Sequence, residues 1–251
     1  DLDQDGFEDI VAVHEDNDYI RIAFGSDDPD VWHLVTLAEG DEAAAAEDVA
    51  IGDANNDGWL DIVVACELSH LIYFQNPGDT EAIRAGAWPR TMPSLTRDRG
   101  SWIRVFFADY DGDGKLEVSA PNKGDQLTAG GNRPDAFEEK ETSWFQLPNE
   151  PLDGDQWQEH VLSRIKIPMN AQPVDLDNDG DLDLLAGSRF EMRPFWFENK
   201  GGHPLEFVEH PINVAGYNAE RLPEGQFAGK WLTSMNVVFD DLNHDGRLDI
   251  I

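Results

Sequence analysis

The chain has 251 residues, of which 40% are hydrophobic, so it is long enough to bury a sizeable core in one or two domains. Its formal net charge of −33 argues against nucleic acids and anionic membrane surfaces as partners. Cys66 is the only cysteine, which excludes an intrachain disulfide framework and a cysteine-based zinc site. No apolar run approaches the roughly 18 residues of a transmembrane helix, so we expect no direct membrane insertion.

A nine-residue acidic pattern opens the chain and returns four more times, about 60 residues apart. The copies begin at Asp1, Asp53, Asp109, Asp175 and Asp241. Each has an acid at position one, Asp or Asn at three, Asp at five, glycine at six and an acid at nine. The recurrence of the whole pattern indicates a repeated structural unit, and we call the copies loops 1 to 5.

The fourth copy shows why this pattern points to a metal. Asp175, Asp177 and Asp179 alternate, and Gly180 follows at once and permits a sharp turn. A tight loop of this kind turns the three carboxylates towards one point, where they repel each other unless a cation lies between them. Calcium, which takes about six to eight oxygen ligands, fits best. The backbone carbonyl at position seven and the carboxylate of Asp183 can complete its shell.

An EF-hand is a competing interpretation, but its closing glutamate stands at position twelve and helices flank its loop. Here the closing acid stands at position nine, and the flanking segments 49–52 and 62–65 are strand-like. The other alternative is a set of acidic turns without metal. We expect up to five structural Ca²⁺ sites. The predicted ligands are Asp1, Asp3, Asp5, Asp9, Asp53, Asn55, Asp57, Asp61, Asp109, Asp111, Asp113, Glu117, Asp175, Asp177, Asp179, Asp183, Asp241, Asn243, Asp245 and Asp249.

Between the loops the chain repeats a plan of four short strands. An apolar strand follows each loop, at 10–13, 62–65, 118–120 and 184–186. A second strand with an aromatic centre comes next, at 19–24, 71–74, 144–145 and 195–197. The third strand begins at Trp32, Trp88, Trp157 or Phe207. The fourth leads into the next loop, at 48–51, 104–107, 170–173 and 236–239.

Four strands per unit predict an all-β fold, a β-propeller of four-stranded antiparallel blades. No helical period persists for long, and residues 42–47 form one turn of helix or a loop. We expect a single, partial propeller domain over 1–251. Its repeat units run over about 1–52, 53–108, 109–174 and 175–240, with the start of a fifth at 241–251.

The acidic loops, the Ile/Leu-Val-Val-Ala strand and the phrases Trp/Phe-Phe-x-Asn-x-Gly and Trp-x-x-His resemble FG-GAP/VCBS-type propeller repeats, which occur in integrin α-chains and secreted bacterial proteins. The resemblance implies calcium in the loop between the innermost strand and the next, on one face of the disc. Asn55, Asn243 and Glu117 depart from the pattern, and we expect weaker binding in their loops. It also implies about seven blades, so we expect about four blades here and a longer propeller, with the true N-terminus absent.

Two sets of equivalent positions vary in a way that a purely structural role does not explain. Both are predicted to line the central funnel, on the face opposite the loops. The first set follows the apolar strand after each loop: His14, Glu15, Cys66, Glu67, Asn122, Lys123, Ser188 and Arg189. The second set starts the innermost strand: Asp48, Arg104, Asn170 and Asn236. Arg104, Lys123 and Arg189 favour an anion such as a uronate or sulfate. The alternative is a set of rim salt bridges. We expect Cys66 to be a small buried thiol.

Two long insertions open on the same face, at about 122–141 and 213–231. Loops of this length are often functional. The candidate ligand contacts that they carry are Arg133, Tyr217, Asn218, Arg221 and Lys230.

Two functions from different classes follow. The first is a secreted calcium-binding module that presents a glycan- or protein-binding face, with Glu15, Glu67, Asn122, Arg133, Asn170, Ser188 and Asn236 as ligand contacts. The second is a lyase or dehydratase acting on a sugar or uronic-acid polymer, with His14, Arg104, Lys123 and Arg189 neutralising the substrate and moving a proton. Fold alone does not choose between them. Loops that need up to roughly millimolar calcium predict an extracellular, periplasmic or cell-surface location.

Overall fold

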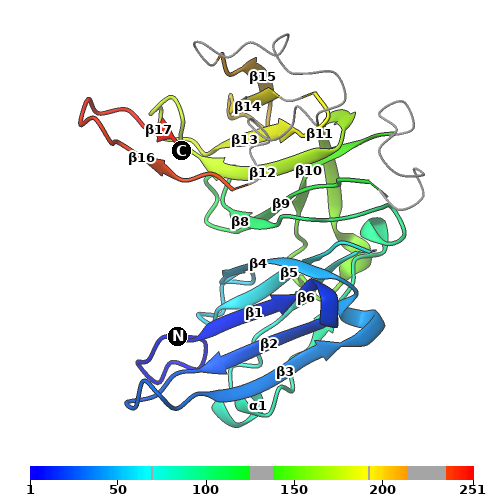
Figure 1. Ribbon diagram of the computed structural model, residues 1–251, viewed down its shortest axis with the longest axis vertical. Coiled ribbons are helices and arrows are strands. Elements are labelled where there is room, and N and C mark those ends of the chain that lie inside the picture. Colours follow the sequence, from blue (N-terminus) through cyan, green and yellow to red (C-terminus); the bar gives the residue numbers. More distant parts are fainter. Residues whose placement is uncertain (69, 125–137, 192, 214–235) are drawn as a thin grey trace.

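The computed structural model describes residues 1–68, 70–124, 138–191, 193–213 and 236–251 (Figure 1). Within these ranges the chain forms antiparallel sheets whose strands follow one another in sequence order, each paired with the next. Three of the sheets have four strands. This arrangement confirms the predicted all-β class with four-stranded antiparallel blades.

The strands divide among five sheets. The first sheet contains β1 (Ile10–His14), β2 (Tyr19–Phe24) and β3 (His33–Glu39). The second contains β4 (Ala46–Gly52), β5 (Asp61–Cys66), β6 (Leu71–Phe74) and β7 (Arg90–Thr91). The third contains β8 (Phe106–Ala108), β9 (Glu117–Pro121), β10 (Glu139–Gln146) and β11 (Gln158–Lys166). The fourth contains β12 (Pro168–Val174), β13 (Asp183–Ser188), β14 (Arg193–Asn199) and β15 (Phe207–Pro211). The last contains β16 (Phe239–Asp240) and β17 (Asp249–Ile250).

Helical structure is short throughout the described residues. The one α-helix there, α1 (Thr80–Arg84), begins after Asp79, whose side chain accepts a hydrogen bond from the Ala82 backbone N–H at 2.9 Å. The remaining helical turns are of the 3₁₀ type and include η2 (Gly40–Ala43) and η5 (Gly154–Gln156). The predicted turn at 42–47 is therefore partly helical, and its last two residues already belong to β4.

Strand β5 shows why the strand that follows each loop is apolar on both faces. All of its residues are buried. Ile62 and Val64 pack into the hydrophobic cluster shared with the first sheet. Val63 and Ala65, which point the opposite way, pack into the cluster shared with the third sheet. A sheet covered on both faces needs apolar side chains on both, so the usual alternation with polar residues is absent.

A third hydrophobic layer lies between the third and fourth sheets, around Tyr110, Phe195 and Phe197. Neighbouring sheets meet along their inner strands, with β1 against β4, β4 against β8, and β8 and β9 against β12. In Figure 1 the first two sheets lie together in the lower half of the view and the third and fourth in the upper half. The core of the protein is thus a series of apolar layers between sheets.

Buried tryptophans fix the connections around these layers. Trp88, Trp102 and Trp157 are almost fully buried. Their indole N–H groups donate to the carbonyls of Ile83, Thr96 and Pro151, at 3.2, 2.9 and 2.8 Å. A buried indole N–H needs such a partner. These side chains therefore contribute both apolar area and a fixed position for the outer connections.

Candidate calcium loops and the opposite face

The five acidic loops share one backbone conformation. Position four is left-handed in all of them, and four of these residues are not glycine: Gln4, Asn56, Asn178 and His244. The glycine at position six is also left-handed in every loop, with φ from 84° at Gly246 to 100° at Gly180. Open space surrounds a Cβ built at these glycines, so the backbone conformation, and not crowding, requires the residue. The sharp turn inferred at position six is present in each loop.

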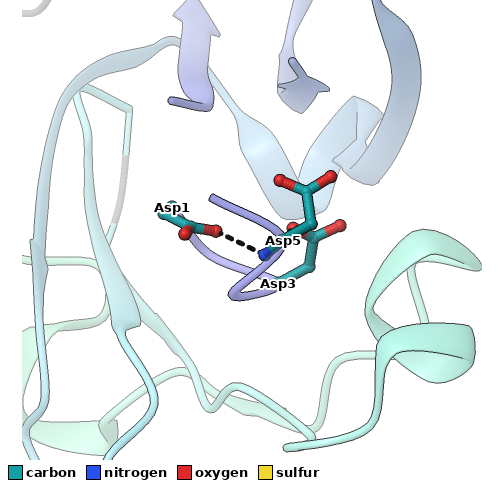
Figure 2. A group of neighbouring side chains, drawn as sticks. All are labelled: Asp1, Asp3 and Asp5. Carbon is teal, nitrogen blue, oxygen red and sulfur yellow. Dashed lines mark hydrogen bonds between the residues drawn. The ribbon is translucent and has the colours of Figure 1, made fainter. Parts of the chain in front are cut away.

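Backbone N–H groups hold the loop side chains inward. In loop 1 the Asp1 carboxylate accepts from the N–H of Asp5 at 3.0 Å and of Gly6 at 2.9 Å, and Asp3 accepts from Asp5 at 3.3 Å. Figure 2 shows Asp1, Asp3 and Asp5 around this turn. Loops 2, 3 and 5 repeat these bonds. Asn55 and Asn243 accept in the place of the third-position aspartate, so their carbonyl oxygens point the same way.

Three loops bring carboxylates close enough to share one cation. The groups, each with one ligand atom per residue within 4.8 Å of the others, are Asp1, Asp3 and Asp5, then Asp109, Asp111 and Glu117, then Asp175, Asp177 and Asp183. In loop 4 the Asp175 Oδ1 atom is buried and has no hydrogen-bond partner within the described ranges. Hard carboxylate and amide oxygens around one point, with a buried lone pair to satisfy, fit Ca²⁺.

The closing acid at position nine is mainly a structural clamp. In loop 2, Asp61 is fully buried, and its carboxylate accepts from the backbone N–H groups of Ala54 at 3.1 Å and Asn76 at 2.8 Å. The Tyr73 hydroxyl donates to it at 2.7 Å. Asp183 accepts equivalent bonds from Leu176 and Asn199. In loops 1, 2 and 4 the clamp therefore ties the start of the loop to the turn after the second strand, a role that the pattern itself did not reveal.

Burial raises the pKa of these clamps. The pKa of Asp61 is raised to about 6 by burial, against the lowering effect of its hydrogen bonds. The pKa of Glu117 is raised to about 7, first by burial and then by the carboxylates of Asp111 and Asp109. A cation held among these groups would favour their ionised forms.

Buried asparagines join the loops of neighbouring sheets. Asn76 donates to the Leu2 carbonyl of loop 1 at 2.9 Å and to the Leu60 carbonyl of loop 2 at 3.2 Å. Asn199 does the same between loops 3 and 4, donating to Tyr110 at 2.7 Å and Leu182 at 3.1 Å. The phrase aromatic-x-Asn-x-Gly was the available signal, since the asparagine stands at the same place in the second and fourth sheets.

Side chains at position four add a second set of links. Gln4 donates to the Gly58 carbonyl of loop 2 at 2.9 Å, and Asn56 donates to the Gly114 carbonyl of loop 3 at 3.0 Å. Position four of loop 3 is Gly112, which has no side chain to offer. Loops 1 to 4 thus form a connected row along one face of the molecule.

Loop 1 has a cationic neighbour that sequence reasoning missed. Arg84, the last residue of α1, places Nε 2.5 Å from Asp3 Oδ2 and Nη2 2.7 Å from Asp5 Oδ2. The Asp3 side chain is fully buried, whereas that of Arg84 is about one third exposed. The guanidinium therefore balances two of the three carboxylates of this loop. The contact joins residues 81 positions apart, and no local pattern announces it.

On the opposite face, the positions after the apolar strands β5, β9 and β13 are equivalent, as the repeat predicted. The backbone N–H groups of Glu67, Lys123 and Arg189 donate to the carbonyls of Ala45, Ser101 and Ile167 in their respective sheets. Lys123 forms an ion pair with Glu67 of the neighbouring sheet. Its charge also interacts with Glu47, Glu15 and Arg189. These residues form one group, which we call the funnel cluster.

The predicted starts of the innermost strands also meet there. Arg104 places Nε 3.6 Å from Asp48 Oδ2, and its Nη1 donates to Asn236 at 3.4 Å. Burial lowers the pKa of Lys123 and raises the pKa values of Glu47 and Asp48. Lys123 and Arg104 thus each lie beside a carboxylate, as expected if these residues form rim salt bridges.

Other predicted contacts on this face have structural partners. Asn122, Asn170 and Ser188 are buried, and each side chain accepts a hydrogen bond from a backbone N–H nearby. His14 lies against Tyr19, with 5.1 Å between ring centroids, and interacts with Asn17. Cys66 is buried, and burial raises its pKa to about 12. The candidates on the insertions lie outside the described residues: Arg133, Tyr217, Asn218, Arg221 and Lys230.

The repeated sheets and loops define a β-propeller-type repeat protein. Residues 1–64 and 175–251, together more than half of the chain, match the FG-GAP-like repeat family, and the chain belongs to this family. The resemblance inferred from the loops is thereby confirmed. No curated protein matches the chain. In the part of the chain that the structure describes, no helix is long and apolar enough to cross a membrane.

Proposed function

We propose that this protein is a calcium-binding propeller module, whose acidic loops hold Ca²⁺ as a structural ion. The observation that carries the proposal is loop 4, where three carboxylates converge and the buried Asp175 Oδ1 has no hydrogen-bond partner among the described residues. Asp175, Asp177 and Asp183 would hold the ion there, and Asp109, Asp111 and Glu117 would do so in loop 3. The ion would supply the positive charge that relieves their mutual repulsion.

Hydrogen bonds between neighbouring loops would let an ion in one loop stabilise the adjoining sheets as well. In loops 1, 2 and 4 the position-nine clamp connects the loop to the turn after the second strand. Asn76 and Asn199 connect that turn to the preceding loop. A loop that is held rigid therefore fixes the junction between two sheets. We infer an extracellular, periplasmic or cell-surface location, where calcium concentrations suit loops of this kind.

A thermal melt of the full chain in Ca²⁺, in Mg²⁺ and in EGTA tests the proposal. We expect the highest melting temperature in Ca²⁺, because Mg²⁺ demands a stricter octahedral geometry. Calcium uptake measured by equilibrium dialysis should fall in the variant D175N/D177N. Identical melting in all three conditions, together with no calcium uptake, would mean that the loops are acidic turns only.

A second candidate function, a ligand-binding face at the funnel cluster, is favoured by two buried atoms. Glu47 Oε2 and Arg104 Nε are buried and make no hydrogen bond within the described residues, although the Arg104 atom lies 3.6 Å from Asp48 Oδ2. A glycan or protein ligand could provide the missing partners. The lyase alternative assigns proton transfer or substrate binding to His14, Arg104, Lys123 and Arg189. It requires that H14A and R189A each abolish turnover of a uronate polymer with little change in melting temperature. A wild-type chain that does not degrade such polymers leaves the binding role.

A further inference from the structure

A cavity of about 380 Å³ lies on the loop face, away from the funnel cluster. Its walls come from loop 2 at Ala54, from loop 3 at Lys115 and Leu116, and from the connection between β10 and β11. This volume falls in the range of small-ligand sites, roughly 300–1,000 Å³. A site of this size on this face is separate from the funnel positions.

Four carboxamides line one side of this cavity: Gln146, Asn149, Gln156 and Gln158. Gln146 and Gln158 are cross-strand partners at the end of the β10–β11 pair, so their side chains share a face. Gln156 ends η5, and Asn149 accepts a hydrogen bond from Lys115 Nζ at 3.0 Å. All four residues are exposed. Each carboxamide offers both a donor and an acceptor to a ligand.

The rest of the lining selects against an anionic ligand. Leu116, Leu147 and Pro148 are half-buried and supply aliphatic surface. The single cation in the lining, Lys115, shares the cavity with Asp113 and Glu117. An anion would meet these carboxylates in a protein whose net charge is −33. A ring that carries hydroxyls at its edge and C–H groups on its face matches both parts of the lining.

We propose that this cavity binds one ring of a neutral saccharide, with the carboxamides of Gln146, Gln156 and Gln158 bonded to its hydroxyls. The ring face would lie on Leu116, Leu147 and Pro148. Hydroxyls donate and accept at once, as carboxamides do, and so both partners can be satisfied. The site needs neither the funnel cluster nor a particular occupancy of the loops, although Asp113 and Glu117 of loop 3 lie at its edge.

Saturation-transfer NMR on the full chain in calcium tests this site. The probes are the methyl glycosides of glucose, galactose, mannose and N-acetylglucosamine, with methyl glucuronide as the charged counterpart. We expect at least one neutral glycoside to bind. The double substitution Q156A/Q158A should raise the Kd for that glycoside by at least about tenfold. The matched control is N213A, which removes an exposed carboxamide outside the cavity and should bind as the wild type does.

Three results would overturn the proposal. One is the absence of binding by every neutral glycoside, and another is preference for the glucuronide. The third is unchanged binding in Q156A/Q158A while K123M, in the funnel cluster, loses it. The calcium-dependent melting temperature of Q156A/Q158A should equal that of the wild type, which shows that the variant folds and that the loops still respond. Glycoside binding therefore tests the cavity proposal, and the calcium-dependent melting temperature separately tests the calcium proposal.

Discussion

Loops 1 and 4 have the same acidic pattern but different neighbours. In loop 1, Arg84 of the second sheet lies against Asp3 and Asp5. In loop 4, Asp175 Oδ1 is buried without a hydrogen-bond partner among the described residues. The pKa of Asp177 is raised there, first by desolvation and then by Asp179. The charge in loop 1 is balanced by a direct ion pair from within the protein. In loop 4 the charge of Lys200 interacts with Asp177 and Asp179, but its ammonium forms its ion pair with Glu198, so the loop carboxylates lack a direct cationic partner among the described residues.

This difference shows that the motif sets the shape of a loop, and that the neighbouring sheet sets its charge. Both loops keep the bond from the position-six glycine to the first aspartate, but the bond from position five to that aspartate is present in loop 1 and missing in loop 4, where Asp175 Oδ1 has no hydrogen-bond partner among the described residues. The guanidinium of Arg84, beside loop 1, competes with a metal for the same carboxylates, because either cation relieves their repulsion. We therefore expect loop 4 to bind Ca²⁺ more tightly than loop 1.

The largest expected effect comes from the clamps. D183A leaves the backbone N–H groups of Leu176 and Asn199 without their buried acceptor. Each such loss costs about 1–3 kcal/mol, so the free energy of unfolding should fall by roughly 2–6 kcal/mol. D9A, at a half-buried site in loop 1, should lose less. Urea denaturation of both variants in calcium measures the difference, and an equal loss would contradict it.

A smaller effect separates the metal-binding positions. At free calcium about 100-fold above its Kd, loop 4 should gain about 2.7 kcal/mol of stability from the ion. D177N should lose most of that gain in calcium and little in EGTA. D3N should lose stability in both conditions, because it removes the partner of Arg84. Paired melts in calcium and EGTA check this, and a calcium-independent D177N would refute the ranking of the loops.

Removal of Arg84 should lower the stability of the protein and raise the affinity of loop 1 for calcium. R84A is expected to destabilise the protein in EGTA by about 1 kcal/mol, because the pair is partly exposed on the arginine side. In calcium the loss should be smaller, since loop 1 becomes free to bind the ion. Calorimetric titration measures calcium uptake by R84A and by the control variant R90A. Arg90 pairs with Glu42, away from the loops. Equal calcium uptake in wild type, R84A and R90A would show that Arg84 does not compete.

The most gradual effect is a pH dependence in EGTA. Because the pKa of Glu117 is raised to about 7, the folded state binds more protons than the unfolded state above the ordinary value of 4.5. Its contribution to stability is present below that value and is lost as pH rises through about 7. E117Q should flatten this part of the profile. Thermal melts of the wild type and E117Q from pH 4.5 to above pH 7 measure this dependence. An equal change of melting temperature with pH in both proteins would assign the dependence to other groups.

The repeat period was enough to predict the strands, the loops and the equivalence of Glu67, Lys123 and Arg189. These features depend on local order along the chain, which the periodic pattern records. The bond from Arg84 to Asp3 and the placement of Asn76 between two loops were not predicted. Each depends on how two sheets pack, and α1 occurs in only one of the described connections. The amide-lined cavity likewise forms from three separate segments, which no single stretch of sequence describes.

The row of links on the loop face has a mechanical consequence. Between the first and second sheets two side chains, Gln4 and Asn76, cross from one loop to the next. Asn56 bridges loops 2 and 3, and Asn199 bridges loops 3 and 4, where Gly112 has no side chain. A force that pulls the sheets apart would therefore meet unequal resistance along the row. On the loop face the first junction should yield last, whereas the second junction is also held on the opposite face by the Lys123–Glu67 and Arg104–Asp48 pairs.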